Sequence, residues 1–391
     1  MSTLPCLQLP VKVPPRYDLV QPLANWLDDE DAQNEFGSIG ESEQLAFVMP
    51  KPAFSSVECR SDLLRLAALR NCLSESLLNG KEELELSLKD CMDYHATLLE
   101  FTKRGFPTTD TSYLQSSWYG AFDRKEKETH QELLWDRACT MWNAVALQSQ
   151  LVKMTDLTSK DSCKKCIQWC QSGASILQVL QEMVEESSQY ATIDFSAPML
   201  SFWHSLLLAQ GQAIIYKMAN LGDSVRQHTT LAYLANGAAQ LFAEALEAAQ
   251  DPRLQSEVPQ ESKDWAIHCK LSSMLFASRA EFHLAIDYRQ QQTWGLEIAR
   301  LTNSVNQMVE VQAFLKDADL EKSSWTAQVE GLARLSRQRW KQATEDNVSI
   351  YSADIPGELP EVRAQVMIKK DQGLPEEMLI PKANLFAFED K

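Results

Sequence analysis

The feature that most constrains this chain is a long central stretch almost free of proline. Between Gly80 and Glu345, proline occurs only at positions 107, 198, 252 and 259, and the rest of the 15 prolines lie towards the two ends. Proline removes a backbone donor and clashes inside a helix, so its scarcity permits long uninterrupted helices. Glycine is also scarce, with 13 in 391 residues. This stretch predicts an all-α core and argues against a sheet-rich fold.

Apolar residues recur at helical spacing in consecutive segments along the chain. Long helices joined by short loops resemble an elongated, tetratricopeptide-like stack, although no repeat of fixed period is present. After Asp346 the periodicity ends and prolines return, which predicts an extended arm. We therefore expect one domain, 1–391, with an extended N-terminal arm (1–22), a helical core (23–345) and an extended C-terminal arm (346–391). The expected helices are 63–78, 82–102, 130–155, 161–188, 202–221, 223–250, 262–288, 294–317 and 322–344.

Composition and charge narrow the class of protein. Hydrophobic residues make up 45% of the chain, enough for a large core, and the formal net charge is −17. A field of this sign repels nucleic acid and anionic lipid, so neither is expected as a bulk partner. The nine cysteines are odd in number, and several lie in apolar helical runs, which indicates reduced thiols. No signal peptide or membrane span is visible, so we expect a cytoplasmic protein.

Motifs that carry catalysis are missing from the sequence. There is no HExxH pattern, no glycine-rich phosphate loop and no G-x-S-x-G elbow. Cys163, Cys166 and Cys170 share one helical face, but a tetrahedral metal site needs a fourth ligand that one helix face supplies poorly. We interpret these cysteines as small buried apolar residues. The sequence predicts no enzyme activity, no metal and no cofactor.

Three segments carry a more specific pattern. They are Leu9–Lys12 with Tyr17–Leu23, then Ser117–Phe122 with Leu134–Leu147, and then Glu281–Ala285, Gln290–Leu301, Asp346–Tyr351 and Ile355–Pro356. In this order they resemble the Bro domain family of the Alix type. Two departures from the family pattern are Trp142, where the family usually has Phe, and Leu296, where it usually has Glu. In the third segment, the spacing lets Glu297 pair with Arg300 along the polar flank of a helix.

The resemblance implies a banana-shaped helical solenoid with a small N-terminal β element at Leu9–Lys12. It implies a stand-alone Bro domain that stops where the V-shaped and proline-rich regions of the family would begin. It also implies a non-enzymatic adaptor that binds the C-terminal amphipathic helix of an ESCRT-III subunit, of the charged multivesicular body protein class. Such an adaptor would be cytoplasmic and recruited to endosomes through its partner. The alternatives are a rhophilin-like small-GTPase effector and a generic helical-repeat scaffold.

In this family the partner helix lies in a shallow apolar groove, and the apolar residues that make the contact recur at helical spacing. The segment from residue 199 best resembles that groove, and the alternative is that its apolar stripe is ordinary helix packing. The groove candidates are Met199, Trp203, Leu206, Gln210 and Ala213, with Thr140, Ala144 and Leu147 from the preceding motif helix.

Two further sites follow from charge and from the resemblance. Lys153, Lys160, Lys164 and Lys165 form a local basic island that could meet the acidic flank of a partner helix or anionic lipid. The alternative is a solvated helix start. The resemblance makes Tyr351 a candidate for phosphorylation, and the alternative is a side chain that anchors the C-terminal arm.

Overall fold

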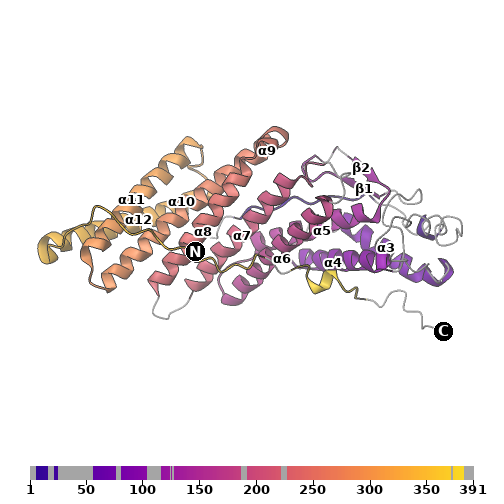
Figure 1. Ribbon diagram of the computed structural model, residues 1–391, viewed down its shortest axis with the longest axis horizontal. Helices are drawn as coiled ribbons and strands as arrows, with labels where there is room; N and C mark the ends of the chain where they lie inside the picture. Colours follow the sequence, from indigo (N-terminus) through magenta and orange to yellow (C-terminus); the bar gives the residue numbers. More distant parts are fainter. Residues whose placement is uncertain are drawn as a thin grey trace, which may run out of the picture. The chain divides into compact units, whose positions relative to one another are not determined.

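The computed structural model of the chain (Figure 1) describes residues 6–15, 22–24, 56–75, 81–103, 116–123, 125, 127–185, 192–221, 227–370 and 373–382. These residues are mainly α-helical, as the sequence predicted. The chain divides into two compact units. Unit 1 contains Met1–Leu7, Val152–Ala174 and Pro198–Asp371, and unit 2 contains Gln8–Leu151, Ser175–Ala197 and Gln372–Lys391. That residues 1–391 form one domain stays a prediction.

Unit 2 is built on helices with one small sheet. Its β strands pair antiparallel, with Ser116 opposite His130 and Tyr119 opposite Lys127. The small β element that the resemblance implied is this two-stranded sheet, and the N-terminal arm adds an isolated bridge from Val13 to Tyr119, whereas Leu9–Lys12 itself forms no strand. Residues 17–21 of the first motif lie outside the described residues. The elements are α3 (Ser56–Glu75), α4 (Lys81–Lys103), β1 (Ser116–Tyr119), β2 (Lys127–His130), most of α5 (Leu133–Met154), the end of α6 (Lys160–Glu185) and the 3-10 helix η2 (Glu376–Met378).

The N-terminal arm lies along α5, and the side chains of α5 satisfy its backbone. Lys12 donates its backbone N–H to Asn143 Oδ1, and Asn143 Nδ2 donates to the Lys12 carbonyl, both at 2.8 Å. Trp142 Nε1 donates to the carbonyl of Pro10 at 2.8 Å. The arm therefore needs no partner strand, since α5 already satisfies these backbone groups. Trp142 is fully buried, so this departure from the family pattern is a packing variant.

Two carboxylates organise the polar interior of unit 2. The Asp136 carboxylate accepts hydrogen bonds from Tyr94, Ser116 and Trp118, and from Arg70 Nε at 3.3 Å. The Lys12 ammonium pairs with the Asp194 carboxylate, which also accepts from the backbone N–H of Ala121 at 3.0 Å. Buried charges persist only when paired and hydrogen-bonded, and both sites meet that condition.

In unit 1, helices that follow one another along the chain pack together: α10 packs against α8 and α11, and α11 packs against α12. Helices α10, α11 and α12 share a core that includes Leu271, Leu275, Met308 and Val311. The observed bounds agree with the predicted segments to within about two turns at each end, and those of α11 coincide with the prediction. The elements are α7 (Ala197–Ala219), α8 (His228–Ala249), α9 (Pro252–Glu257), α10 (Pro259–Gln290), α11 (Trp294–Asp317), α12 (Ser324–Asp346) and the π-helical turn η1 (Asn347–Tyr351).

The charged residues of the third motif pair between helices and not along one helix. Arg300 on α11 donates to both carboxylate oxygens of Glu281 on α10 at 3.1 Å. Glu297 meets Arg289 at 3.4 Å and Arg339 at 3.6 Å. The predicted pairing of Glu297 with Arg300 is therefore wrong. Both side chains are buried, so they bind the partners that neighbouring helices offer.

The C-terminal arm begins one turn later than predicted and then runs extended over α7 and α8. The chain first forms η1, which ends at Ser352 with a φ of 50°. Gln365 donates its backbone N–H to the Tyr233 carbonyl at 2.9 Å. The Gln212 side chain accepts from Met367 and Ile368 and donates to Gln365. The arm is thus held by specific hydrogen bonds within unit 1.

Close approach of this arm requires glycine on the helices below it. A Cβ at Gly237 would lie 2.5 Å from the Gln365 carbonyl oxygen, and one at Gly295 would lie 1.9 Å from that of Asp354. We expect Gly237→Ala to lower the free energy of unfolding by about 1–3 kcal/mol, because the arm must shift. Chemical denaturation measures this directly.

Gly331 provides the matched control, since a Cβ there meets nothing within 4 Å. Gly331 is partly buried in α12 with room for a Cβ, so Gly331→Ala should be neutral or stabilise by up to about 1 kcal/mol, because alanine favours helix. Equal effects of the two substitutions would contradict the proposed packing of the arm.

Candidate partner-binding surface

Helix α7 contains the apolar stripe that the sequence singled out, and the structure buries it. Met199, Trp203 and Leu206 have 0% exposure, Gln210 has 2% and Ala213 has 3%. The neighbouring positions Leu207, Leu208, Ile214 and Ile215 are buried as well. The stretch 206–216 of α7 is buried at every position, so this part of the helix lies in the interior of its unit.

Several segments of unit 1 cover α7. Trp265 on α10 stacks on Phe202 with ring centroids 4.7 Å apart. Near the N-terminus, the Leu7 carbonyl accepts a hydrogen bond from Gln210 Nε2 at 3.3 Å. From the C-terminal arm, Ile368 packs where a Cβ at Gly211 would meet it at 2.6 Å. Segments from both ends of the chain therefore lie on the same helix.

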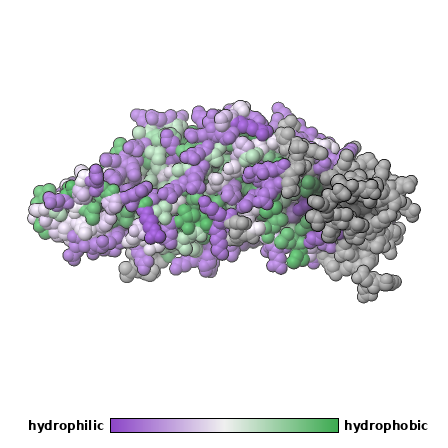
Figure 2. Space-filling model, in the orientation of Figure 1, coloured by the Kyte–Doolittle hydropathy of each residue, from purple (hydrophilic) through white to green (hydrophobic). Residues whose placement is uncertain are grey.

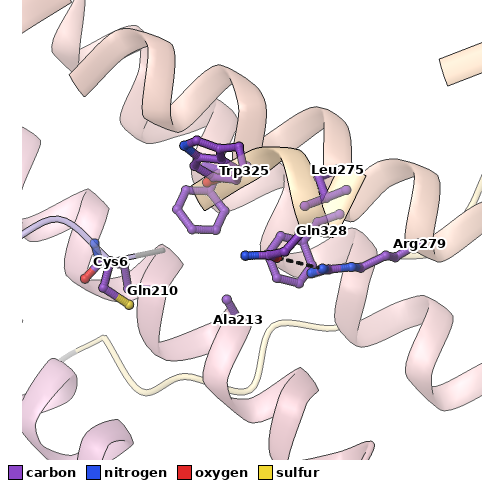
Figure 3. Close-up of a pocket in the computed structure, with 10 residues that line it drawn as sticks. Cys6, Gln210, Ala213, Leu275, Arg279, Trp325 and Gln328 are labelled. Carbon is purple, nitrogen blue, oxygen red and sulfur yellow. Dashed lines mark hydrogen bonds between the residues drawn. The ribbon is translucent and has the colours of Figure 1, made fainter. Parts of the chain in front are cut away.

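The end of the stripe lines a small cavity, which Figure 3 shows. Gln210 and Ala213 on α7 face Trp325 and Gln328 on α12, and Arg279 on α10 donates to Gln328 Oε1 at 3.1 Å. The cavity measures about 10 Å³, the space of about one water molecule. It does not admit a side chain of a partner helix.

The three candidates from α5 belong to unit 2 and are buried there. Thr140 and Ala144 have 0% exposure and Leu147 has 1%. The Thr140 hydroxyl donates to the Asp136 carbonyl of its own helix at 2.7 Å.

The expectation that these eight residues line an open groove is thus not met in the structure, because each one is buried. Contact with a partner stays a prediction for them. The signal that sequence reasoning missed was the apolar run on both flanks of the stripe, at 207–208 and 214–215, which leaves residues 206–216 of α7 without a solvent face.

The basic island is exposed, as a surface contact requires. Lys153, Lys160, Lys164 and Lys165 are all solvent-exposed in unit 1. Lys164 Nζ lies 3.3 Å from Asp161 Oδ1, and Lys165 Nζ lies 5.0 Å from the ring centroid of Trp169. Exposed lysines keep their charge available at low energetic cost.

Tyr351 lies in η1 and stacks on Trp294, with ring centroids 3.9 Å apart and an interplanar angle of 12°. Its exposed fraction is 36%. The neighbouring Val348 and Ile350 are exposed, and apolar side chains are visible at this end of α12 in Figure 2. The stack anchors the start of the C-terminal arm, while phosphorylation of Tyr351 stays a prediction.

The cysteine cluster has the environment of buried apolar residues. Cys163, Cys166 and Cys170 are buried, and burial raises the pKa of the Cys170 thiol well above its ordinary value. Among the described residues, no three His, Cys, Asp or Glu side chains are arranged to hold a metal ion. No helix in the described ranges combines the length and the apolar character needed to cross a membrane.

Comparison with known proteins connects this fold with one family. Residues 52–387 match the sequence model of the BRO1-like domain. ALG-2 interacting protein X of Dictyostelium discoideum is 26% identical over 326 residues, which is 81% of this chain and 39% of that protein. The chain spans less than half the length of the first curated relatives it matches.

Solved structures agree on the fold. A complex of the ALIX BRO1 domain with CHMP4C superposes with a TM-score of 0.78 at 20% identity, covering 98% of this chain and 99% of that one. A Bro1 domain studied for endosomal targeting has a TM-score of 0.71 at 16% identity, covering 95% and 93%.

Proposed function

Because the chain belongs to the family of BRO1-like domains, we propose that it is a non-enzymatic adaptor that binds the C-terminal helix of an ESCRT-III subunit. The observation that carries the proposal is the family match over residues 52–387. The similarity in fold to the ALIX BRO1 domain bound to CHMP4C supports it, since CHMP4C is an ESCRT-III subunit. Through such a partner the protein would be recruited to endosomes, a location that the Bro1 domain studied for endosomal targeting also suggests.

The exposed chemistry of unit 1 suggests how the partner is held. The chain as a whole carries a net charge of −17, so four exposed lysines between residues 153 and 165 are a local exception. An amphipathic helix with an acidic flank would be oriented by these lysines, because complementary charges steer association and fix register. The buried stripe of α7 would supply apolar contacts only after the segments that cover it move aside.

Charge reversal of the basic island tests this proposal without touching the core. We expect Lys160→Glu together with Lys164→Glu to weaken binding of an ESCRT-III C-terminal peptide by about fivefold or more, because each exposed pair contributes up to about 1 kcal/mol. Fluorescence anisotropy with a labelled peptide measures this. The affinity of the unmodified protein should also fall as salt is added.

Lys322→Glu is the matched control, since Lys322 is equally exposed in unit 1 but lies outside the island. Lys322→Glu changes the net charge by the same amount as each of the two island substitutions, and it should leave the affinity for the peptide nearly unchanged. If neither protein binds the peptide, the adaptor function is wrong. If the double variant binds as tightly as the unmodified chain, the function stands and the island is not its contact surface.

A further inference from the structure

A second surface of unit 1 is hollowed between three helices, away from the α7 stripe. The groove has a volume of about 530 Å³ and is lined by α8, α10 and the end of α11, with Gln255 of α9 at its edge. Its floor and walls are largely apolar, and most of these side chains are only partly buried, so they face the groove. The apolar lining consists of Leu246, Pro259, Ala266, Ile267, Phe314 and Ala318.

The lining residues follow helical spacing on each wall. On α10 they recur at 259, 262, 263, 266, 267 and 270, which is one continuous stripe three turns long, or about 16 Å. On α8 they stand four apart, at 246 and 250, and on α11 at 314, 317 and 318. Each helix thus turns one face towards the same groove. A groove of this length matches a helix of about three turns better than a single small molecule.

The charged residues that line the groove indicate which sign of charge its partner carries. Lys263 and Lys270 are exposed and stand seven residues apart on α10, so they lie two turns apart on one face. Lys270 Nζ lies 4.3 Å from the ring centroid of Phe314, which keeps this cation at the edge of the apolar floor. Asp317 is the acidic side chain of the lining. Two cations beside an apolar floor, on a chain with a charge of −17, favour an acidic partner with apolar anchors.

We propose that this groove is a docking site for an acidic amphipathic helix of a partner protein, separate from the site of the proposed function. Apolar side chains of the partner at i, i+3/i+4 and i+7 enter between α8 and α11. Carboxylates spaced two turns apart on its flank meet Lys263 and Lys270. A small ligand site normally encloses most of its ligand, whereas this groove is open along one side, which suits a helix whose other face stays in solvent.

A designed peptide tests the groove directly. The probe is a fluorescein-labelled helix of about four turns, with Leu and Phe on one face and Glu along the flank, and its partner probe has Lys in place of Glu. We expect the acidic peptide to bind the unmodified chain and the basic peptide to bind at least about tenfold more weakly. Ala266→Trp should fill the groove and weaken binding of the acidic peptide by about tenfold or more.

Charge reversal and a control complete the experiment. Lys263→Glu with Lys270→Glu should reduce binding of the acidic peptide and increase binding of the basic one, whereas Lys322→Glu should change neither. We expect each variant to fold, because all of these positions are at the surface or only partly buried. Melting curves check this. Equal binding by the unmodified and Ala266→Trp proteins would overturn the proposal. The proposal would also be overturned if the chain self-associates and Ala266→Trp abolishes that self-association, since the groove would then be an interface between two copies.

Discussion

Asp136→Asn is expected to destabilise unit 2 by about 3–5 kcal/mol, a large part of the 5–15 kcal/mol that holds a typical domain together. Asp136 is 1% exposed, and its carboxylate accepts from Tyr94, Ser116, Trp118 and Arg70. Asparagine keeps the shape but loses the charge and replaces one acceptor with a donor. Chemical denaturation, monitored by tryptophan fluorescence, measures the change.

The cost falls mainly on Arg70. Its side chain is fully buried, and although burial lowers the pKa of the guanidinium, the neighbouring Asp136 carboxylate outweighs that effect and raises it overall. Arg70 therefore stays charged, and the substitution removes the Asp136 carboxylate beside it while its hydrogen bonds to the carbonyls of Pro15 and Ser117 remain. The loss of a carboxylate that stabilises a buried charge is the reason for the large effect.

Two variants separate this cause from a general loss of packing. Asp161→Asn removes a carboxylate from an exposed pair with Lys164 and should leave stability unchanged within measurement. Arg70→Met combined with Asp136→Asn removes both charges and should recover part of the loss, because the asparagine oxygen can still accept a hydrogen bond and no buried guanidinium loses its carboxylate. A double variant less stable than Asp136→Asn alone would show that packing and not charge dominates.

The helices were predictable because they depend on local patterns. The residues 294–317 read as one helix from apolar spacing and from the polar turns at either end, and α11 has those bounds. The extended arms were predictable only in outline. Their paths depend on partners far away in sequence, such as Asn143 for the N-terminal arm and Gln212 for the C-terminal one. No local pattern indicates which helix an arm will follow.

The β element and the ion pairs show the same limit. Leu9–Lys12 has the composition of a strand, yet α5 side chains satisfy backbone groups that a neighbouring strand would have bonded. Glu297 and Arg300 have the spacing of a helical pair, but on α10 the buried Glu281 and the half-buried Arg289 offer partners. Tertiary contacts of this kind override a weak local preference, because a surface pair on one helix contributes only a few tenths of a kcal/mol.

The candidate site was harder to predict than the fold. Helical spacing identified a stripe on α7, but spacing alone does not distinguish a docking groove from a buried packing face. The width of the apolar surface distinguishes the two, and the central part of α7 is apolar on the flanks of the stripe as well, which indicates a packing face. The groove formed by α8, α10 and α11 could not be found from one segment, because its lining comes from stretches more than 50 residues apart, at 246–250 and 314–318.

Leu206→Asp distinguishes the two interpretations of α7. Leu206 has 0% exposure, so we expect the substitution to unfold unit 1 or to lower its melting temperature by about 10 °C or more. Loss of the buried leucine costs about 1.5–3 kcal/mol, and an unpaired carboxylate among apolar side chains costs several kcal/mol more. Thermal melting and binding of an ESCRT-III C-terminal peptide are measured on the same protein.

The milder Leu206→Ala keeps this test informative if the aspartate variant does not fold. It should cost about 2–5 kcal/mol as a cavity in a packed core, and the remaining folded protein should bind the peptide with nearly unchanged affinity. Near-native stability of Leu206→Asp together with lost peptide binding would contradict the buried assignment. In that case the N-terminal segment at Leu7 and the arm at 365–368 would have to leave α7 in solution, since they are among the segments that cover it. The stripe would then be the docking surface that helical spacing first indicated.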